Sequence, residues 1–422
     1  MPNNWKTYKF EELYLEPSRN GVSKPKSVRG IGFKMVNMGE IFKYSFISNQ
    51  VMDRVQLTDA EYNKSMLAEG DLLFARQSLV ASGVGKCILV NELNEETTFE
   101  SHLIRVRLKN AIAYPKFIYY KFQSQNIRNI VISLSNGVAA HGIKGSDLQN
   151  IELELPPLPE QKSIASILSA IDDKIENNLA INKTLEEMAM ALYKHWFVDF
   201  GPFQDGEFVE SELGRIPKGW EVKNLGSIVS VLGGYAFKSA WFQDSGVKVL
   251  KIKNINNNIV DINNCTCISE EISKTINPKF RVTKGDFLIA MTGAEVGKVG
   301  AVPDYNQELW LNQRVGKLVD KELKNASILI GKLLQTNDFY KVMQGLAYGS
   351  AQPNISTSDI ESIKIALPID KSILNEIIDE FVNSHEIIIQ NLTENQTLTQ
   401  FRDTLLPKLI SGEVRLKEFM ES

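Results

Sequence analysis

The sequence predicts an α+β fold in which two repeated, strand-rich α/β domains are separated by two long antiparallel helices. The helices would pack as a coiled-coil-like pair with pseudo-twofold symmetry. Two observations predict this fold: the chain repeats itself, and each copy precedes a long segment whose apolar residues recur in steps of three and four. We expect a first domain over 1–155, a spacer helix over 156–200, a linker and second domain over 201–367, and a C-terminal spacer helix and tail over 368–422.

The repeat extends over most of each predicted domain. Trp5 corresponds to Trp220, and later segments match at offsets of 215 and then 212 residues. The matched pairs are 57–71 with 272–286, 82–90 with 294–302, and 142–157 with 354–369. Short β-branched runs such as DLLFA and KCILV predict strands, with short helices over 115–125 and 326–334. Periodicity predicts a mixed, strand-rich domain but does not give its topology.

The first long helix is predicted over 158–200. Prolines precede it and Gly201-Pro202 follow it, as is typical of helix ends. At ~1.5 Å per residue, about forty residues give a helix roughly 60 Å long. Its apolar seam is interrupted where Asn178 and Asn182 occupy seam positions. The seam residues are Ile164, Leu168, Ile171, Ile175, Leu185, Ala189, Leu192 and Trp196.

The second long helix is predicted from about 372 to 406, with Pro407 and Gly412 as signals for its end. Each helix has only the other as a partner, and the intervening domain favours antiparallel packing. Asn178 and Asn182 would then face Asn391 and Asn395, where buried asparagines fix the register of a helix pair. An equally supported alternative is that the apolar seam shifts locally around the helix, so that some of these asparagines face solvent. Its seam residues are Leu374, Ile378, Phe381, His385, Ile388, Leu392 and Asn395.

Composition indicates a globular protein of two or three domains, with 422 residues, 43% hydrophobic and 23% charged. We expect a cytoplasmic protein, because the N-terminus lacks an apolar signal segment and three cysteines do not form a disulfide framework. The net charge of −4 is uneven: +3 over 1–155, −6 over 156–210, +4 over 211–367 and −5 over 368–422. Any contact with a polyanion is therefore expected on the globular domains.

Catalytic signatures are not found in the sequence. The Gly85-Lys86 and Gly297-Lys298 pairs lack the hydroxyl residue and the spaced glycine that a phosphate-binding P-loop requires. Asn277-Pro278-Lys279-Phe280 lacks the second proline of an adenine methyltransferase loop, and a metal-nuclease pattern fails at Trp310. The four histidines do not suggest a zinc site or a catalytic triad. We expect neither an enzyme nor a metal or cofactor site in this chain.

Polar residues in matched loops are the candidates for recognition of DNA, because Arg, Lys, Asn and Gln contact base edges and phosphates. In the first copy they are Arg76, Gln77, Ser78, Lys86, His102, Arg105, His141 and Lys144. In the second copy they are Tyr235, Lys238, Lys253, Asn254, Thr292, Lys298, Asn312, Gln313, Arg314, Gln352 and Asn354. We align Ser101-His102 with Leu311-Asn312. Any single one of these residues is alternatively a solvated surface residue, and the Gly-Lys pairs are alternatively tight turns. Asp147 and Asp359 are better explained as capping residues.

The chain resembles the specificity (S) subunits of type I restriction-modification systems. The resemblance is carried by LPPLPEQKSIASILSAIDDKIENN (155–178), ELGRIPKGWEVKNLG (212–226), AQPNISTSDIESIKIALP (351–368) and FRDTLLPKLISGEVRL (401–416). It covers nearly the whole chain and is loose in the domain loops. At the second junction, 367–371 lacks the Pro-Leu and Glu-Gln of the first, which leaves the start of the second helix open.

The resemblance implies that each domain is a target-recognition domain for one half of a bipartite DNA sequence. It implies two methyltransferase (M) subunits as partners, which carry S-adenosylmethionine, and restriction (R) subunits, which use ATP and Mg²⁺. Half-sites on one face of DNA lie about 34–36 Å apart, a separation that a pair of ~60 Å helices can hold. Two other hypotheses remain at this point: a protein-only scaffold whose helices assemble partners, and an enzyme with an unrecognised site.

Overall fold

The computed structural model describes residues 4–135, 141–256, 258–347 and 353–416. The chain divides into two compact units. Unit 1 comprises Met1–Asp173 and Leu398–Ser422, and unit 2 comprises Lys174–Thr397. Each unit therefore contains one strand-rich domain and a part of both long helices, α6 (Leu158–Tyr193) and α11 (Lys371–Ser411). The predicted α+β class is confirmed.

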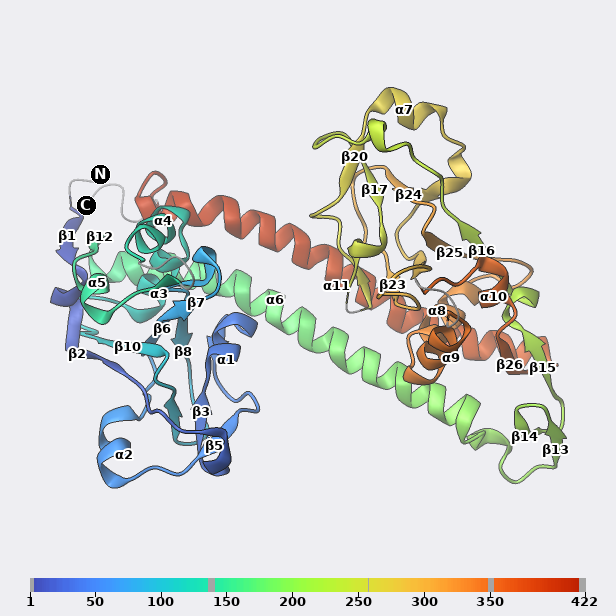
Figure 1. Ribbon diagram of the computed structural model, residues 1–422, viewed down its shortest axis with the longest axis horizontal. Coiled ribbons are helices and arrows are strands. Elements are labelled where there is room, and N and C mark those ends of the chain that lie inside the picture. Colours follow the sequence, from blue (N-terminus) through green and yellow to red (C-terminus); the bar gives the residue numbers. More distant parts are fainter. Residues whose placement is uncertain (1–3, 136–140, 257, 348–352, 417–422) are drawn as a thin grey trace. The chain divides into compact units, whose positions relative to one another are not determined.

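Unit 1 is built around a sheet with the strand order β2-β10-β6-β8-β4, beside a second sheet with the order β5-β3-β9 (Figure 1). Strands β1 and β12 pair antiparallel near the start of α6. Its strands are β1 (Lys6–Lys9), β2 (Tyr14–Asn20), β3 (Arg29–Val36), β4 (Phe46–Ile47), β5 (Asp53–Val55), β6 (Leu72–Ala75), β7 (Gln77–Ser78), β8 (Cys87–Val90), β9 (Thr97–Phe99), β10 (Leu103–Leu108), β11 (His141–Gly142) and β12 (Glu152–Leu155). Its helices besides α6 and α11 are α1 (Met38–Lys43), α2 (Asp59–Ser65), α3 (Pro115–Gln123), α4 (Gln125–Ser133) and α5 (Gly145–Gln149).

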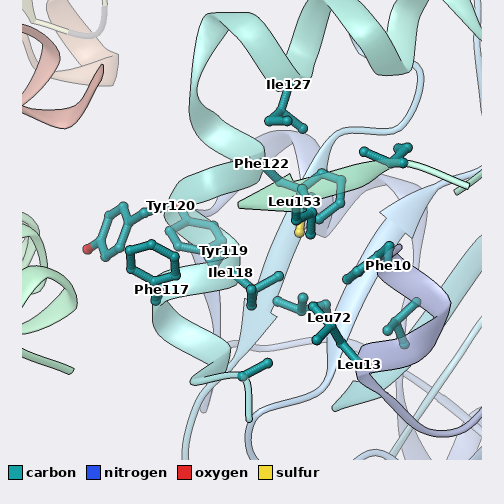
Figure 2. Close-up of a cluster of buried hydrophobic side chains, with 14 of the residues drawn as sticks. Phe10, Leu13, Leu72, Phe117, Ile118, Tyr119, Tyr120, Phe122, Ile127 and Leu153 are labelled. Atoms are coloured by element: carbon teal, nitrogen blue, oxygen red, sulfur yellow. The ribbon is translucent and has the colours of Figure 1, made fainter. Parts of the chain in front are cut away.

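The apolar run Leu72–Ala75 forms a strand that is buried on both faces. Leu72 and Phe74 pack into the core beneath α3, and Leu73 and Ala75 pack into a second core on the opposite face. Alternate side chains of a strand point to opposite faces, so a strand covered on both sides is apolar throughout. Figure 2 shows the first core, where Leu72 lies among Phe10, Leu13, Phe117, Ile118, Tyr119, Tyr120, Phe122, Ile127 and Leu153.

Unit 2 repeats this architecture with the main sheet β16-β25-β22-β23-β19-β18 and the second sheet β20-β17-β24-β21. Its strands are β13 (Phe208–Ser211), β14 (Gly214–Pro217), β15 (Trp220–Asn224), β16 (Val229–Gly233), β17 (Val247–Leu250), β18 (Ile255–Asn256), β19 (Ile259–Val260), β20 (Thr266–Ile268), β21 (Arg281–Val282), β22 (Phe287–Ala290), β23 (Val299–Ala301), β24 (Leu309–Leu311), β25 (Val315–Asp320) and β26 (Lys364–Pro368). Its helices besides α6 and α11 are α7 (Glu270–Thr275), α8 (Ala326–Leu334), α9 (Asn337–Ala347) and α10 (Thr357–Glu361).

The backbone hydrogen bonds of the two units confirm the repeat and both of its offsets. Gly70 N donates to Val90 O at 2.8 Å, and Gly285 N donates to Val302 O at 2.8 Å. In each pair the donor is shifted by 215 residues and the acceptor by 212. The two capping aspartates are confirmed as well: Asp147 accepts from Lys144 N, and Asp359 accepts from Ser356 N. The matched segments of the two units thus form equivalent turns.

The first helix ends close to the predicted point. After Tyr193, α6 continues into one turn of π-helix over Lys194–Val198, and Phe200 then adopts a left-handed conformation with φ 48°. The second helix runs beyond its predicted end, because Pro407 lies inside α11. Proline removes a single backbone donor. Burial of Leu406, Leu409 and Ile410 in the core of unit 1 holds the following turn in place. Gly412, with φ 74°, ends the helix.

The helices are antiparallel within each unit. Five of the eight predicted seam residues of α6 are buried, whereas Ile175, Leu185 and Leu192 are half-buried. All seven predicted seam residues of α11 are buried, including His385, which is 2% exposed. In unit 2, Asn178 contacts Asn395, and Asn182 contacts Asn391. The seam is wider than predicted, because Ile377 and Ile389 of α11 pack on the domain core of unit 2. Each helix is therefore an integral part of the domain cores as well as a partner of the other helix.

Candidate nucleic-acid interface

The loop between β24 and β25 presents exposed polar residues on a fixed backbone in unit 2. Tyr235 and Asn312 form a bridge, in which Tyr235 N donates to Leu311 O at 2.8 Å and Gln313 N donates to Tyr235 O at 2.9 Å. Asn312 Oδ1 also accepts a hydrogen bond from Arg314 N at 3.3 Å. The side chains of Gln313 and Arg314 are exposed. These bonds leave the loop side chains to contact a ligand while the backbone stays rigid.

A second bridge brings Thr292 and Asn354 to the same edge of unit 2. Thr292 pairs with Asn354, Met291 N donates to Arg314 O at 3.1 Å, and Ile355 N donates to Met291 O at 2.9 Å. Gln352, the neighbouring candidate, lies outside the described residues. Six predicted residues are therefore gathered at one edge: Tyr235, Thr292, Asn312, Gln313, Arg314 and Asn354.

Aromatic and basic side chains extend this edge, and several of them were not among the predicted residues. Tyr235 stacks on Trp241 with ring centroids 6.4 Å apart, and the predicted Lys238 places its Nζ 5.3 Å from the centroid of the Trp241 ring. Lys251 Nζ lies 3.5 Å from the centroid of the Phe242 ring. The sequence signal was the mixture of aromatic and basic residues in GYAFKSAWF (234–242). Such surfaces bind nucleic acids through stacking and through the phosphates.

Two predicted residues of unit 2 are already engaged within the protein. Asn254 is 1% exposed, its Oδ1 accepts from Lys251 N at 2.9 Å, and its Nδ2 donates to Asp261 O at 2.9 Å. Asn254 thus holds the turn on which Lys253 is exposed. Lys298 is half-buried and forms an ion pair with Glu295. Neither Asn254 nor Lys298 is free for a base contact without breaking these bonds.

Unit 1 gathers its candidates at the matching edge. Arg76 N donates to His102 O at 2.8 Å, and Ile143 N donates to Arg76 O at 2.9 Å. Strands β7 and β11 pair antiparallel, which sets Ser78 opposite His141. Gln77 and His102 are exposed at this edge. Lys144 lies beyond it with an exposed side chain, and its backbone N–H is capped by Asp147.

The structure changes the alignment of one loop between the two copies. Leu103 pairs with Ala75 in unit 1, and Val315 pairs with Ala290 in unit 2. His102 therefore corresponds to Arg314, and the predicted alignment of His102 with Asn312 is wrong by two residues. Glu100, which bridges Val22, is the true equivalent of Asn312. Strand pairing fixes this register, and the short, dissimilar loop sequence does not reveal it.

Arg105 is buried, and both terminal nitrogens of its guanidinium group donate hydrogen bonds. The residue is 3% exposed; Nη2 donates to Glu16 at 2.7 Å and Nη1 donates to Met66 O at 2.9 Å. Burial lowers the pKa of Arg105, and the acidic Asp71 and Glu16 oppose that shift. Breaking this pair would leave a buried carboxylate or guanidinium without a partner. Arg105 therefore stabilises the sheet through Glu16 and Met66 and does not lie at the edge with His102.

Lys86 lies beside the edge of unit 1 that gathers Gln77, Ser78 and His102, which is called the recognition edge below. Its Nζ donates to Phe42 O at 3.3 Å and lies 5.3 Å from the centroid of the Phe42 ring. Burial lowers the pKa of Lys86, and the like charge of Arg128 lowers it further. Arg128 itself donates from Nη2 to Ser82 O at 2.7 Å and to Val84 O at 3.0 Å. The like charges of Lys86 and Arg128 favour an anion such as a DNA phosphate.

The described residues contain no helix that is long and apolar enough to cross a membrane. Within the same residues, His, Cys, Asp and Glu side chains do not gather in a group of three or more that could hold a metal ion.

Comparison with known proteins identifies relatives along the whole chain. The sequence model of the type I restriction modification DNA specificity domain matches residues 2–187 and 217–400. The type I restriction enzyme MjaIX specificity subunit of Methanocaldococcus jannaschii is 31% identical over 310 residues, which cover 72% of this chain and 70% of the relative. The HindI specificity subunit of Haemophilus influenzae is 22% identical over 476 residues, covering 98% of this chain and 100% of the relative. The crystal structure of a type I S subunit from M. genitalium has the same fold, with a TM-score of 0.60 at 17% identity and 97% coverage of both chains.

Proposed function

Since this chain belongs to the family of type I restriction-modification specificity subunits, we propose that it recognises a bipartite DNA sequence and assembles methyltransferase subunits around it. Unit 1 recognises one half-site and unit 2 recognises the other. The single observation that carries this proposal is the pair of matching edges. Both are built by the same backbone hydrogen bonds, yet His102 in one corresponds to Arg314 in the other.

Different side chains on the same backbone fit two different base sequences. Arginine makes paired hydrogen bonds to guanine O6 and N7, and glutamine makes paired hydrogen bonds to adenine N6 and N7. Arg314 and Gln77 are exposed at their respective edges. Lys86, Lys238 and Lys253 then act on phosphates and position the domains without recognising sequence.

We assign the assembly role to the two long helices. The α6 helix exposes large apolar side chains within unit 2: Leu179 is 44% exposed, Ile181 39% and Met188 54%. Apolar side chains exposed along a helix are typical of a surface that binds partner helices. Two methyltransferase subunits would bind there, and restriction subunits would join them. The chain is non-catalytic in this proposal, with S-adenosylmethionine, ATP and Mg²⁺ held by those partners. Recognition would lie in 1–155 and 201–367, and assembly in 156–200 and 368–422.

Methylome mapping tests this function. The chain is co-expressed with its methyltransferase partner in a host that lacks other adenine methylation, and the genome is sequenced by single-molecule methods. We expect methyladenine in a motif of two short specified parts separated by unspecified bases. A continuous motif, or no methylation by an intact complex, would contradict the proposal.

The alternative of a protein-only scaffold predicts a different result. A scaffold forms the complex with the methyltransferase, but binding of that complex to duplex DNA would not depend on this chain. Retention of the complex on DNA over a range of salt concentrations separates the two functions, because each phosphate contact steepens the salt dependence of binding.

A further inference from the structure

An apolar hollow of about 410 Å³ lies beside the recognition edge of unit 1. The Leu79 hollow, as it is called below, is lined by Met38, Phe42, Gln77, Ser78, Leu79 and His102. Leu79 is 88% exposed and Phe42 is 44% exposed. Isolated exposed apolar residues are common, but several that surround one hollow next to polar recognition residues indicate a binding site.

The backbone of unit 1 projects Leu79 outward. Ser78 is held in the pairing of β7 with β11, and its Oγ accepts a hydrogen bond from Val80 N at 3.2 Å. This bond closes a tight turn with Leu79 at its tip. Phe42 packs over Gly83, where an added Cβ would lie 3.1 Å from Phe42 Cε1 and 2.3 Å from Ser78 Oγ. The hollow is therefore preformed, with an apolar floor and an apolar tip.

The charges around the Leu79 hollow favour a polyanion. Lys86 lies against Phe42, and Arg128 is the charged group next to Lys86. The acidic Glu100 is engaged, because its Oε1 accepts from Met38 N and its Oε2 lies 3.8 Å from His102 Nδ1. A neutral apolar surface beside basic residues fits the major groove of DNA, where thymine is distinguished by its C5-methyl group.

We propose that the Leu79 hollow receives the C5-methyl group of a thymine in the half-site that unit 1 recognises. Gln77 and Leu79 both line the hollow, Gln77 from β7 and Leu79 from the turn that follows β7. Gln77 can then form paired hydrogen bonds with the adenine of the same base pair, while Leu79 and Phe42 cover the methyl group of the thymine. The inference rests on the proposed function and specifies one A·T pair of the first half-site.

Unit 2 does not share this feature. Gly85 N donates to Ala75 O in unit 1 and Gly297 N donates to Ala290 O in unit 2, so the offset changes from 215 to 212 between these residues. Because 82–90 match 294–302, the extra residues 79–81 of unit 1, Leu79 among them, have no counterpart in the sequence of unit 2. The thymine methyl contact is therefore expected for the half-site of unit 1 alone.

Replacement of thymine by uracil tests the proposal, because it removes only the methyl group. The complex of the full chain with its methyltransferase is titrated with duplexes that carry the mapped motif and deoxyuridine at each thymine in turn. We expect one position in one half-site where uracil weakens binding about threefold to tenfold, as loss of a buried methyl group predicts. In the Leu79→Ala variant, the two duplexes should bind equally, and Leu79→Met should retain most of the difference.

Val51→Ala is the matched control, since Val51 is 94% exposed in unit 1 and does not line the hollow. It should leave the difference between thymine and uracil unchanged. The proposal is overturned if the complex binds its motif but no thymine shows the effect, or if Leu79→Ala retains it. It is also overturned if Leu79→Ala instead weakens association with the methyltransferase. Failure of the wild-type complex to bind any specific duplex would contradict the proposed function itself.

Discussion

Asn178 and Asn395 meet in the seam between the two long helices, where Nδ2 of Asn178 donates a 2.9 Å hydrogen bond to Oδ1 of Asn395. One turn further along, Nδ2 of Asn391 donates to Oδ1 of Asn182 at 2.8 Å. Asn178 is fully buried and Asn395 is 8% exposed. A polar layer within an apolar seam forms its hydrogen bonds at one alignment of the helices, so we propose that these four residues set the register of the pair.

Substitution of Asn395 by leucine should destabilise unit 2 by about 1–3 kcal/mol, because Nδ2 of Asn178 would lose a buried partner. Urea unfolding of the full chain measures the shift in midpoint. The double variant Asn178→Leu/Asn395→Leu should recover much of the loss, because both polar groups are then removed together. A double variant that loses as much stability as the sum of the single variants would exclude a specific pair.

Arg415→Ala should destabilise unit 1 strongly. Nε and Nη2 of Arg415 donate to the two oxygens of Glu160 at 3.0 and 2.9 Å, and the side chain of Glu160 is 1% exposed. Removal of arginine leaves a buried carboxylate unpaired, which costs about 3–5 kcal/mol. Thermal unfolding and hydrogen exchange over 158–173 report the loss. Glu413→Ala, an exposed neighbour, is the control, and the pair is unimportant if both variants behave alike.

Arg314→Ala should weaken recognition of one half-site only. Loss of a bidentate contact to guanine costs about 1–3 kcal/mol of discrimination at one base position. Methylome mapping of the variant complex should show one position of the motif become degenerate, while the other half-site stays unchanged. Lys324→Ala is the control, because Lys324 is exposed beyond the opposite end of β25. Equal relaxation of both half-sites would contradict recognition of one half-site by each unit.

The stability of unit 2 should fall in mild acid because of His385. Burial lowers the pKa of His385 to about 4, and the charge of Lys332 adds to the shift. The neutral ring stacks on Phe287, and its Nε2 donates to Gly285 O at 3.2 Å. In the unfolded chain, His385 has the ordinary histidine pKa of about 6.5. The neutral His385 ring therefore makes its full contribution to the unfolding free energy above about pH 6.5. This contribution decreases by up to roughly 3 kcal/mol as the pH falls to about 4.

The variant His385→Gln tests this assignment, since glutamine can retain a donor to Gly285 O but does not titrate. Its unfolding free energy should depend less on pH between about 4 and 6.5 than that of the wild type. His102→Gln removes an exposed histidine of unit 1 and is the matched control. Equal pH dependence in the wild type and the His385 variant would show that other groups cause the acid effect.

Sequence patterns predicted some of the exposed loop residues correctly and others incorrectly. Residues such as Arg314 and Gln77 were predicted as candidates, and the structure brings them to matching edges. Arg105 was predicted by the same reasoning, yet it lies inside with Glu16. Its neighbour His102, three residues earlier, is exposed. Residue type alone does not distinguish the two cases, because the direction of a side chain depends on the strand that contains it and on what covers that strand.

The sequence by itself determined the repeat, the two helices and their seams, because these depend on local periodicity and on matched spacing along the chain. Tertiary structure alone decided the register of His102 with Arg314, the continuation of α11 through Pro407, and the hollow around Leu79. Each of these depends on contacts between residues far apart in the chain. Such contacts can outweigh a local signal: burial of Leu409 and Ile410 holds the last turn of the helix although one backbone donor is lost at the proline.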